Sequence, residues 1–285
     1  MTTHHLVVQS PALSAEHAEQ LAALAQAQGI ARISATAARL LDVQHDESTR
    51  AEVVAWAEGR GIDTAFLPAG LKLSDCKVLA MDMDSTLINI ECIDEIAGVV
   101  GVKDKVSEIT EAAMRGEIKD FAESLRRRVA LLEGVPAEAL DQVYAEKLRL
   151  NPGAERLIST AQAAGIKVLL VSGGFTFFTD RLRERLKLDS AHANTLEIDN
   201  GVLTGKVLGD ILDADAKAMH LREFARRHGA TQEQIIAMGD GANDLKMLAA
   251  AGFPVAYHAK PLVRQQTRYA LNVSGLDGVL SWFEG

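Results

Sequence analysis

Two aspartates stand two positions apart in the stretch LAMDMDST at residues 79–86. Asp82 and Asp84 follow an apolar run, Val78 to Met81, of the kind that forms a buried strand. In an extended chain, residues i and i+2 point to the same side, about 6 to 7 Å apart, so both carboxylates face one place. Two like charges this close repel each other and raise the pKa of at least one group. The spacing therefore indicates a site that needs a cation.

Two further apolar runs also end in polar residues. Val168 to Val171 leads into Ser172-Gly173-Gly174, and Ile235 to Met238 leads into GDGAND at residues 239–244. Short apolar runs separated by helical segments predict a doubly wound α/β fold with a parallel sheet. In such folds, sites collect at the carboxyl ends of the strands. The polar side chains expected to share one small volume there are Asp82, Asp84, Ser172, Asp240, Asn243 and Asp244.

This set of residues is suited to phosphoryl transfer. Clustered carboxylates need a cation, and ligands that are all oxygen select a hard ion such as Mg²⁺. The Ser172 hydroxyl and the amides of Gly173 and Gly174 can donate hydrogen bonds to phosphate oxygens. One carboxylate can attack phosphorus, and a second can protonate the leaving alkoxide and then deprotonate water. Each motif alone also fits a turn or a helix cap, and Asp244 fits an N-cap almost equally well; their joint occurrence favours function.

The remaining pattern predicts what covers the site. Residues from about 90 to 150 are helical and too long for an ordinary crossover, so they predict a cap over the strand ends. Asn200-Gly201, between two alternating segments, predicts a β-hairpin. Residues 71–285 would thus form one catalytic domain with an inserted helical cap.

Residues 1–70 predict a separate small α+β domain. Ser14 is expected to cap a helix that runs to Gln28 and stops at Gly29. Arg32 to Leu41 is expected to form one strand, and the turn-forming stretch Pro68-Ala69-Gly70 is expected to be the linker. This region contains no reactive constellation.

Composition excludes several classes of protein. Thirty Lys and Arg against 39 Asp and Glu give a formal net charge of −9, which argues against nucleic acid as a partner. Two cysteines outside any CxxC pair predict reduced thiols. No apolar run is long enough for a membrane span, and MTTHHLVVQS lacks the pattern of a signal peptide. We therefore expect a soluble cytoplasmic protein that does not bind membranes.

Four short motifs occur in a fixed order: DMDST, VSGG, the lysine of DADAK, and GDGAND. Over about residues 75–285 they resemble the haloacid dehalogenase superfamily of phosphatases. The resemblance implies Asp82 as the nucleophile and Asp84 as the general acid and base. It implies Mg²⁺ held by Asp82, the Asp84 backbone carbonyl and Asp240, with Asp244 in support. Ser172 and Lys217 would bind the phosphoryl group, although Lys217 alone reads as a solvated helix cation.

Longer stretches carry a narrower resemblance. DMDSTLINIECIDEIA, ITEAAMRGEIKDFAESLRRRVALLEG and VSGGFTFF resemble the phosphoserine phosphatase family. This implies hydrolysis of the small molecule O-phosphoserine in the last step of serine biosynthesis. Glu91 would contact its ammonium and Arg128 its carboxylate, Phe121 would close over it, and Asn243 would touch the phosphate side. The residue types alone would instead predict that Glu91 lies on the surface, that Arg128 belongs to a charged helix face, and that Phe121 packs in the core.

The N-terminal region lies outside these motifs, and two other functions compete with the predicted one. Residues 1–70 look like the small ACT-like ligand-binding or dimerising modules of some bacterial members, which implies a homodimer. A close rival function is a phosphotransferase that passes the phosphoryl group to an alcohol such as homoserine. A rival from another class is a non-catalytic sensor of divalent metal, but a sensor needs ligands and no nucleophile.

Overall fold

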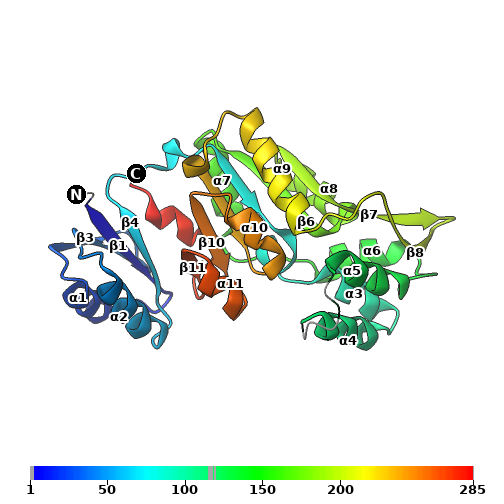
Figure 1. Cartoon of the computed structure of the whole chain (residues 1–285), viewed down its shortest axis with the longest axis horizontal. Coiled ribbons are helices and arrows are strands. Elements are labelled where there is room, and N and C mark those ends of the chain that lie inside the picture. Colours follow the sequence, from blue (N-terminus) through cyan, green and yellow to red (C-terminus); the bar gives the residue numbers. More distant parts are fainter. Residues whose placement is uncertain (1–2, 115–117, 119, 285) are drawn as a thin grey trace.

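The protein contains two β-sheets that lie side by side along its long axis (Figure 1). The computed structural model describes residues 3–114, 118 and 120–284. The smaller sheet has four strands in the order β2-β3-β1-β4, and the larger has seven in the order β11-β10-β9-β5-β6-β7-β8. Every neighbouring pair in the larger sheet is parallel except the β7–β8 hairpin. The predicted doubly wound α/β class is confirmed.

Helices cover both faces of the larger sheet. Successive residues of a strand face opposite sides of the sheet, and the central strands are apolar at every position, so both faces must be buried. The strands are β5 (Val78–Met81), β6 (Lys167–Phe175), β7 (Ser190–Asp199), β8 (Val202–Leu208), β9 (Ile235–Gly239), β10 (Phe253–Tyr257) and β11 (Tyr269–Leu271). On one face lie α7 (Ala154–Ala163), α8 (Thr176–Leu186) and the 3₁₀ helix η6 (Leu276–Trp282). On the other lie α9 (Ala214–Arg227), α10 (Leu245–Leu248) and α11 (Pro261–Gln266). The sequence analysis did not predict β10 and β11.

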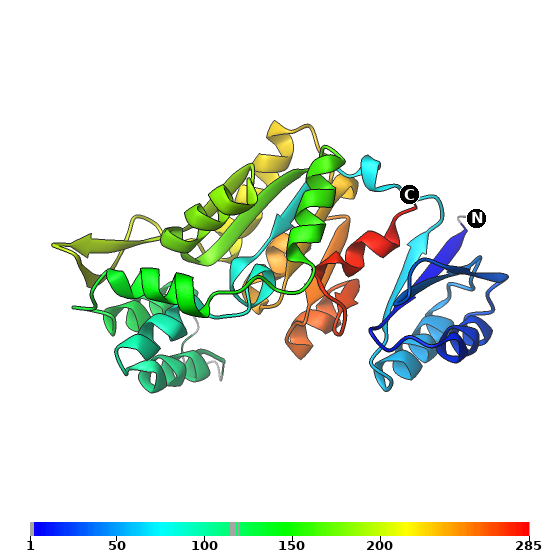
Figure 2. The ribbon, with the colours of Figure 1, turned by 180° about the vertical axis from the view of Figure 1, so that it is seen from behind.

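A helical cap is inserted after β5 and the short turn η2 (Met83–Leu87). It consists of α3 (Cys92–Val99), α4 (Lys103–Met114), α5 (Phe121–Ala130), α6 (Glu138–Gln142) and η3 (Val143–Lys147). The predicted hairpin at Asn200-Gly201 joins β7 to β8, and Figure 2 shows it extending beside the cap helices. Leu203 exchanges backbone hydrogen bonds with the cap loop, donating to Val135 O and accepting from Gly134 N, both at 2.8 Å. The hairpin therefore fixes the outer end of the cap.

The N-terminal sheet differs in detail from the pattern expected. Its elements are β1 (His4–Gln9), α1 (Ala15–Leu24), β2 (Gly29–Arg32), β3 (Ala37–Leu41), α2 (Glu47–Glu58) and β4 (Asp63–Pro68). Ser14 caps α1 as predicted, but the helix ends at Leu24, and Gly29 opens a strand instead of ending the helix. The prediction of one strand over residues 32–41 is wrong. That segment begins with the last residue of β2, continues through a turn held by the Thr36 N to Ser34 Oγ hydrogen bond, and ends with β3.

The two sheets make direct contact. Val7, Ala65 and Leu67, on the face opposite α1 and α2, belong to the apolar core of the larger sheet. At the start of β4, the buried Asp63 carboxylate accepts hydrogen bonds from three successive backbone amides, residues 272–274, at 2.6 to 3.2 Å. Since three charge-assisted hydrogen bonds hold that loop, the N-terminal sheet is anchored to the end of β11.

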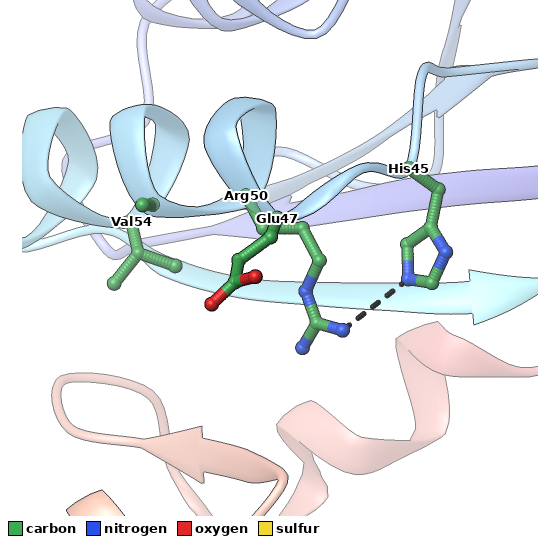
Figure 3. Close-up of a pocket in the computed structure, with 5 residues that line it drawn as sticks. His45, Glu47, Arg50 and Val54 are labelled. Carbon is green, nitrogen blue, oxygen red and sulfur yellow. Dashed lines mark hydrogen bonds between the residues drawn. The ribbon is translucent and has the colours of Figure 1, made fainter.

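A surface pocket opens beside α2 (Figure 3). It is lined by His45, Glu47, Arg50, Ala51 and Val54, and Arg50 donates a hydrogen bond to His45 Nε2 at 3.4 Å. All five residues belong to the N-terminal region, so this pocket is separate from the carboxyl ends of the large sheet. Among the described residues, no helix is long and apolar enough to span a bilayer.

Candidate active site

Asp82 directly follows β5 at the centre of the large sheet. The residue is 4% exposed, and its Oδ1 accepts a hydrogen bond from Met83 N at 2.7 Å. The chain then leaves the strand through Asp84, in extended conformation, and Ser85, at φ 57°. This left-handed residue turns the backbone sharply, so the loop of residues 83–87 stays near the strand end.

Lys217 lies in the first turn of α9, which the Asp213 side chain caps by accepting from Ala216 N at 2.9 Å. It is fully buried, and its Nζ lies 2.7 Å from both Asp82 Oδ1 and Asp244 Oδ1. Burial lowers the pKa of Lys217, but the Asp244 and Asp82 carboxylates outweigh that effect and raise the pKa above its ordinary value. Lys217 is therefore a buried ammonium, not the solvated cation that its residue type alone suggested.

Three carboxylates meet beside this ammonium. Asp82, Asp240 and Asp244 each place one oxygen within 4.8 Å of the others. Asp244 serves two roles, because its Oδ2 also accepts from the backbone amides of Asp240 and Gly241 at 3.1 Å. Thr86 Oγ1 donates to Asp240 Oδ1 at 3.2 Å. The structure thus brings together the predicted residues from β5, β9 and α9.

The electrostatics of this cluster fit a divalent cation. Burial, and then the charge of Asp244, raise the pKa of Asp240 to about 7 and the pKa of Asp82 well above its usual range. One ammonium does not balance two buried carboxylates and the partly buried Asp240, and their ligand atoms are all oxygen. A hard cation such as Mg²⁺ suits this donor set.

Asp84 lies on the other side of the strand end, toward β6. Its Oδ1 accepts from Cys92 N at 3.3 Å, and its Oδ2 would be only 2.6 Å from a Cβ placed on Gly174. Burial, followed by the charge of Glu91, raises the pKa of Asp84 to about 7. A carboxyl group with this pKa both donates and accepts a proton at neutral pH.

Ser172, Gly173 and Gly174 leave the regular pairing of β6 and form a loop beside Asp84. Ser172 is 1% exposed, and its Oγ accepts from Gly174 N at 2.8 Å. A Cβ on Gly173 would lie 3.0 Å from Phe121 Cζ, so the first residue of α5 rests against this loop. The cap therefore covers the strand ends in this structure.

Two cap residues carry charge toward the site. Ser85 Oγ donates to Glu91 Oε1 at 2.6 Å, and burial raises the pKa of Glu91. Burial lowers the pKa of Arg128, while the negative charges of Glu91, Asp94 and Asp84 oppose that effect. Arg128 is thus the inward member of its arginine run, whereas the exposed Arg127 pairs with Glu123.

Asn243 lies in the turn that follows β9. Its Oδ1 would lie 2.3 Å from a Cβ on Gly241, so the side chain folds back over this turn.

Three residues that contact the site were not predicted from the sequence: Thr86, Cys92 and Asn194. Of these, the buried Asn194 in β7 carried a signal, because asparagine is depleted in strands.

A family model of haloacid dehalogenase-like hydrolases matches residues 79–249, and a domain of unknown function, DUF4072, matches residues 6–53. The fold and site accordingly define a hydrolase of the haloacid dehalogenase class. A phosphoserine phosphatase of a Polaromonas species is 58% identical over 214 residues, 74% of this chain and 91% of that protein. The chain belongs to the phosphoserine phosphatase family, as predicted, and is a phosphoric monoester hydrolase.

Solved structures agree with this assignment. The unliganded probable phosphoserine phosphatase from Vibrio cholerae has a TM-score of 0.82 at 39% identity, covering 98% of this chain and 85% of that one. A structure described as a phospho-aspartyl intermediate analogue of phosphoserine phosphatase has a TM-score of 0.69 at 38% identity, covering 73% and 99%. Since the first match spans nearly the whole chain, it extends to the N-terminal sheet.

Proposed function

We propose that this protein is a Mg²⁺-dependent phosphatase that converts O-phosphoserine to serine and phosphate through an aspartyl-phosphate on Asp82. It would catalyse the last step of serine biosynthesis. The observation that carries the proposal is the position of Asp82 Oδ1, 2.7 Å from the Lys217 ammonium and within the cluster formed with Asp240 and Asp244. In this proposal Asp82 is the nucleophile, Lys217 supplies a cation, and the three carboxylates bind the metal at the same strand end. The phospho-aspartyl analogue of a related phosphatase supports the intermediate.

The first half-reaction transfers the phosphoryl group to the enzyme. An Asp82 oxygen forms a bond to phosphorus as the bond from phosphorus to the serine oxygen breaks. Asp84 gives its proton to that oxygen, so serine leaves as a neutral alcohol. Ser172, the amides of Gly173 and Gly174, and Lys217 bind the transferring oxygens and offset their charge.

The second half-reaction releases phosphate. Asp84, now ionised, takes a proton from water while the water oxygen bonds to phosphorus and the bond to Asp82 breaks. The pKa of about 7 suits Asp84 to both steps. Mg²⁺, held by Asp82, Asp240 and the Asp84 backbone carbonyl with Asp244 in support, would neutralise phosphate charge.

We assign recognition of the amino-acid part of the substrate to the cap. In the proposed complex the Glu91 carboxylate receives the substrate ammonium, and the Arg128 guanidinium binds the substrate carboxylate with parallel hydrogen bonds. Phe121 closes over the ligand, and Asn243 touches its phosphate side. The test of the function is a panel of phosphomonoesters that includes O-phosphoserine, with free phosphate measured. Adding homoserine and measuring phosphohomoserine separates hydrolysis from the rival phosphotransfer.

Removal of divalent metal is expected to abolish turnover. Without a cation, the carboxylates of Asp82, Asp240 and Asp244 would repel the phosphate dianion. Burial and their mutual repulsion would also keep the pKa values of Asp82 and Asp240 raised. EDTA treatment followed by dialysis should therefore lower phosphate release to background. Mg²⁺ should restore it better than Ca²⁺, which prefers more ligands at longer distances. Full activity after chelation, with metal content checked by mass spectrometry, would contradict the metal assignment.

Arg128→Ala is expected to raise KM for O-phosphoserine about 10- to 100-fold, because it removes charge-assisted hydrogen bonds to the carboxylate. O-phosphoethanolamine, which lacks the carboxylate, should show almost no change. The matched control is Arg127→Ala, since Arg127 is exposed and pairs with Glu123. Equal losses on both esters would mean that Arg128 does not recognise the amino acid.

We further propose that residues 1–70 form a domain separate from residues 71–285, with the cap at about 90–150. Support comes from a small core of its own, built from residues such as Leu6, Leu21 and Val53. The expected homodimer and cytoplasmic location stay predictions.

A further inference from the structure

The loop that faces the phosphoryl site arises from a break in strand pairing. Along β6 and β7, Val171 pairs with His192, but the next pair is Phe175 with Asn194. Four steps along β6 thus correspond to two along β7, so residues 172–174 bulge out of the ladder. Bulges of this kind redirect groups near active sites and leave backbone groups without strand partners.

The side chain of Asn194 supplies one of the missing partners. Its Nδ2 donates to Gly173 O at 2.8 Å, and its Oδ1 accepts from Leu212 N at 2.7 Å. The residue is 2% exposed. Since Gly173 O can only accept and Leu212 N can only donate, the chemistry fixes which end of the amide faces which partner. Only an uncharged amide of this length provides both interactions.

Holding the Gly173 carbonyl also orients the next amide. A trans peptide is planar, so the Gly173 C=O and the Gly174 N–H point in opposite directions. With the carbonyl directed to Asn194, the Gly174 N–H points to Ser172 Oγ, at 2.8 Å. Gly174 lies against Asp84, since a Cβ there would be 2.6 Å from Oδ2. Rotation of this peptide would turn the Gly173 carbonyl oxygen toward Ser172 Oγ, and the hydrogen bond from Gly174 N would be lost.

The other end of Asn194 reaches the lysine helix. Leu212 precedes Asp213, which caps α9, and Asp213 O accepts from Lys217 N at 2.9 Å. One buried amide therefore joins the serine–glycine loop to the start of the helix that carries the Lys217 ammonium. Both phosphoryl-binding elements take their position from the same side chain.

We propose that Asn194 is a positioning residue for phosphoryl transfer: it fixes the peptide between Gly173 and Gly174 so that the Gly174 N–H holds the Ser172 hydroxyl in place for the transferring phosphoryl group. The inference rests on the proposed function, in which that loop binds phosphoryl oxygens. The contact matters most when negative charge develops on those oxygens, so its loss affects the transition state more than substrate binding.

The test compares Asn194→Asp with wild type in the full-length, Mg²⁺-loaded enzyme. Aspartate keeps the acceptor for Leu212 N but sets an oxygen against Gly173 O. We expect kcat to fall about 100-fold while KM for O-phosphoserine changes by less than about threefold. The affinity for orthovanadate, a transition-state mimic, should fall by the same factor as kcat, whereas the affinity for inorganic phosphate should change little. If the aspartate variant does not fold, Asn194→Ser replaces it in the test. Serine is uncharged and too short to reach Gly173 O, so the same changes in kcat and vanadate affinity are expected.

The control is Thr195→Val, on the adjacent and exposed residue whose Oγ1 contacts Thr176 Oγ1 at 3.3 Å. Its kinetics should match wild type. A purely structural role for Asn194 predicts a lower melting temperature with kcat per folded enzyme and vanadate affinity unchanged, and that result would overturn the inference. Absence of phosphatase activity in wild type and Thr195→Val would instead overturn the proposed function.

Discussion

Asp82→Asn is expected to reduce kcat by a factor on the order of 10⁴ or more, the scale seen when a nucleophile is removed from a covalent mechanism. An amide nitrogen and oxygen cannot displace the serine alkoxide, so no phosphoryl-enzyme forms. The fold should survive, because asparagine has the same shape and its Oδ1 can still accept from Met83 N. Lys217 also keeps its second partner, Asp244, at 2.7 Å.

Phosphate release and the melting temperature are the two measurements for this variant. Binding of O-phosphoserine should persist, since Glu91, Arg128 and Ser172 are unchanged. Asp199→Asn, at the exposed tip of the β7–β8 hairpin, is the matched control and should have wild-type activity. Retention of more than about a tenth of wild-type kcat, after exclusion of deamidation by mass spectrometry, would show that Asp82 is not the nucleophile.

The architecture of the large sheet was predictable because its central strands are read from apolar runs alone. Residues buried on both faces must be apolar along their whole length, and Val78–Met81 was predicted with its exact bounds. The edge strands β10 and β11 lacked this signal. Phe253–Tyr257 contains a proline, and Tyr269–Leu271 has only three residues. The predicted strand over residues 32–41 ran through the turn before β3 because that turn contains no glycine or proline.

Placement of the site was predictable to the same extent. Asp82 and Asp240 directly follow β5 and β9, and Ser172 follows the apolar run of β6, so parallel pairing alone brings them together. Lys217, by contrast, is carried by a helix, and no spacing rule says that its ammonium enters the core; only the family resemblance indicated it. Asn194 acts through its amide on a backbone carbonyl exposed by a bulge. Bulges arise from three-dimensional register, so periodicity in one sequence does not reveal them.

The charge balance of the site links its stability to its chemistry. Lys217 lies between Asp82 and Asp244, with exposed side-chain fractions of 1%, 6% and 0%. Removing one partner of a buried ionic group leaves uncompensated charge and costs about 3 to 5 kcal/mol. Lys217→Met, measured in EDTA by urea unfolding, should lose stability on that scale. It should also lower kcat about 1,000-fold in Mg²⁺, because the phosphoryl oxygens lose a cation.

The sign of the pH dependence follows from the direction of the Lys217 pKa. That pKa is raised in the folded protein, so the ammonium contributes its full stability below the unfolded-state pKa of about 10.4. The contribution is lost only as the pH rises through the folded-state pKa. The deficit of Lys217→Met should therefore be complete at neutral pH and shrink only in strong alkali.

A matched surface pair and a double variant separate burial from charge. Lys246 Nζ lies 2.7 Å from Asp215 Oδ2, but their side chains are 54% and 75% exposed. Lys246→Met should cost at most about 1 kcal/mol, since exposed pairs are weak. Lys217→Met combined with Asp244→Asn also removes one of the carboxylates that the first substitution leaves without a cation, so part of the lost stability should return. The departure from additivity measures the interaction energy between Lys217 and Asp244. Equal costs for the two lysine variants, or strict additivity in the double variant, would mean that the buried ammonium does not hold these carboxylates together.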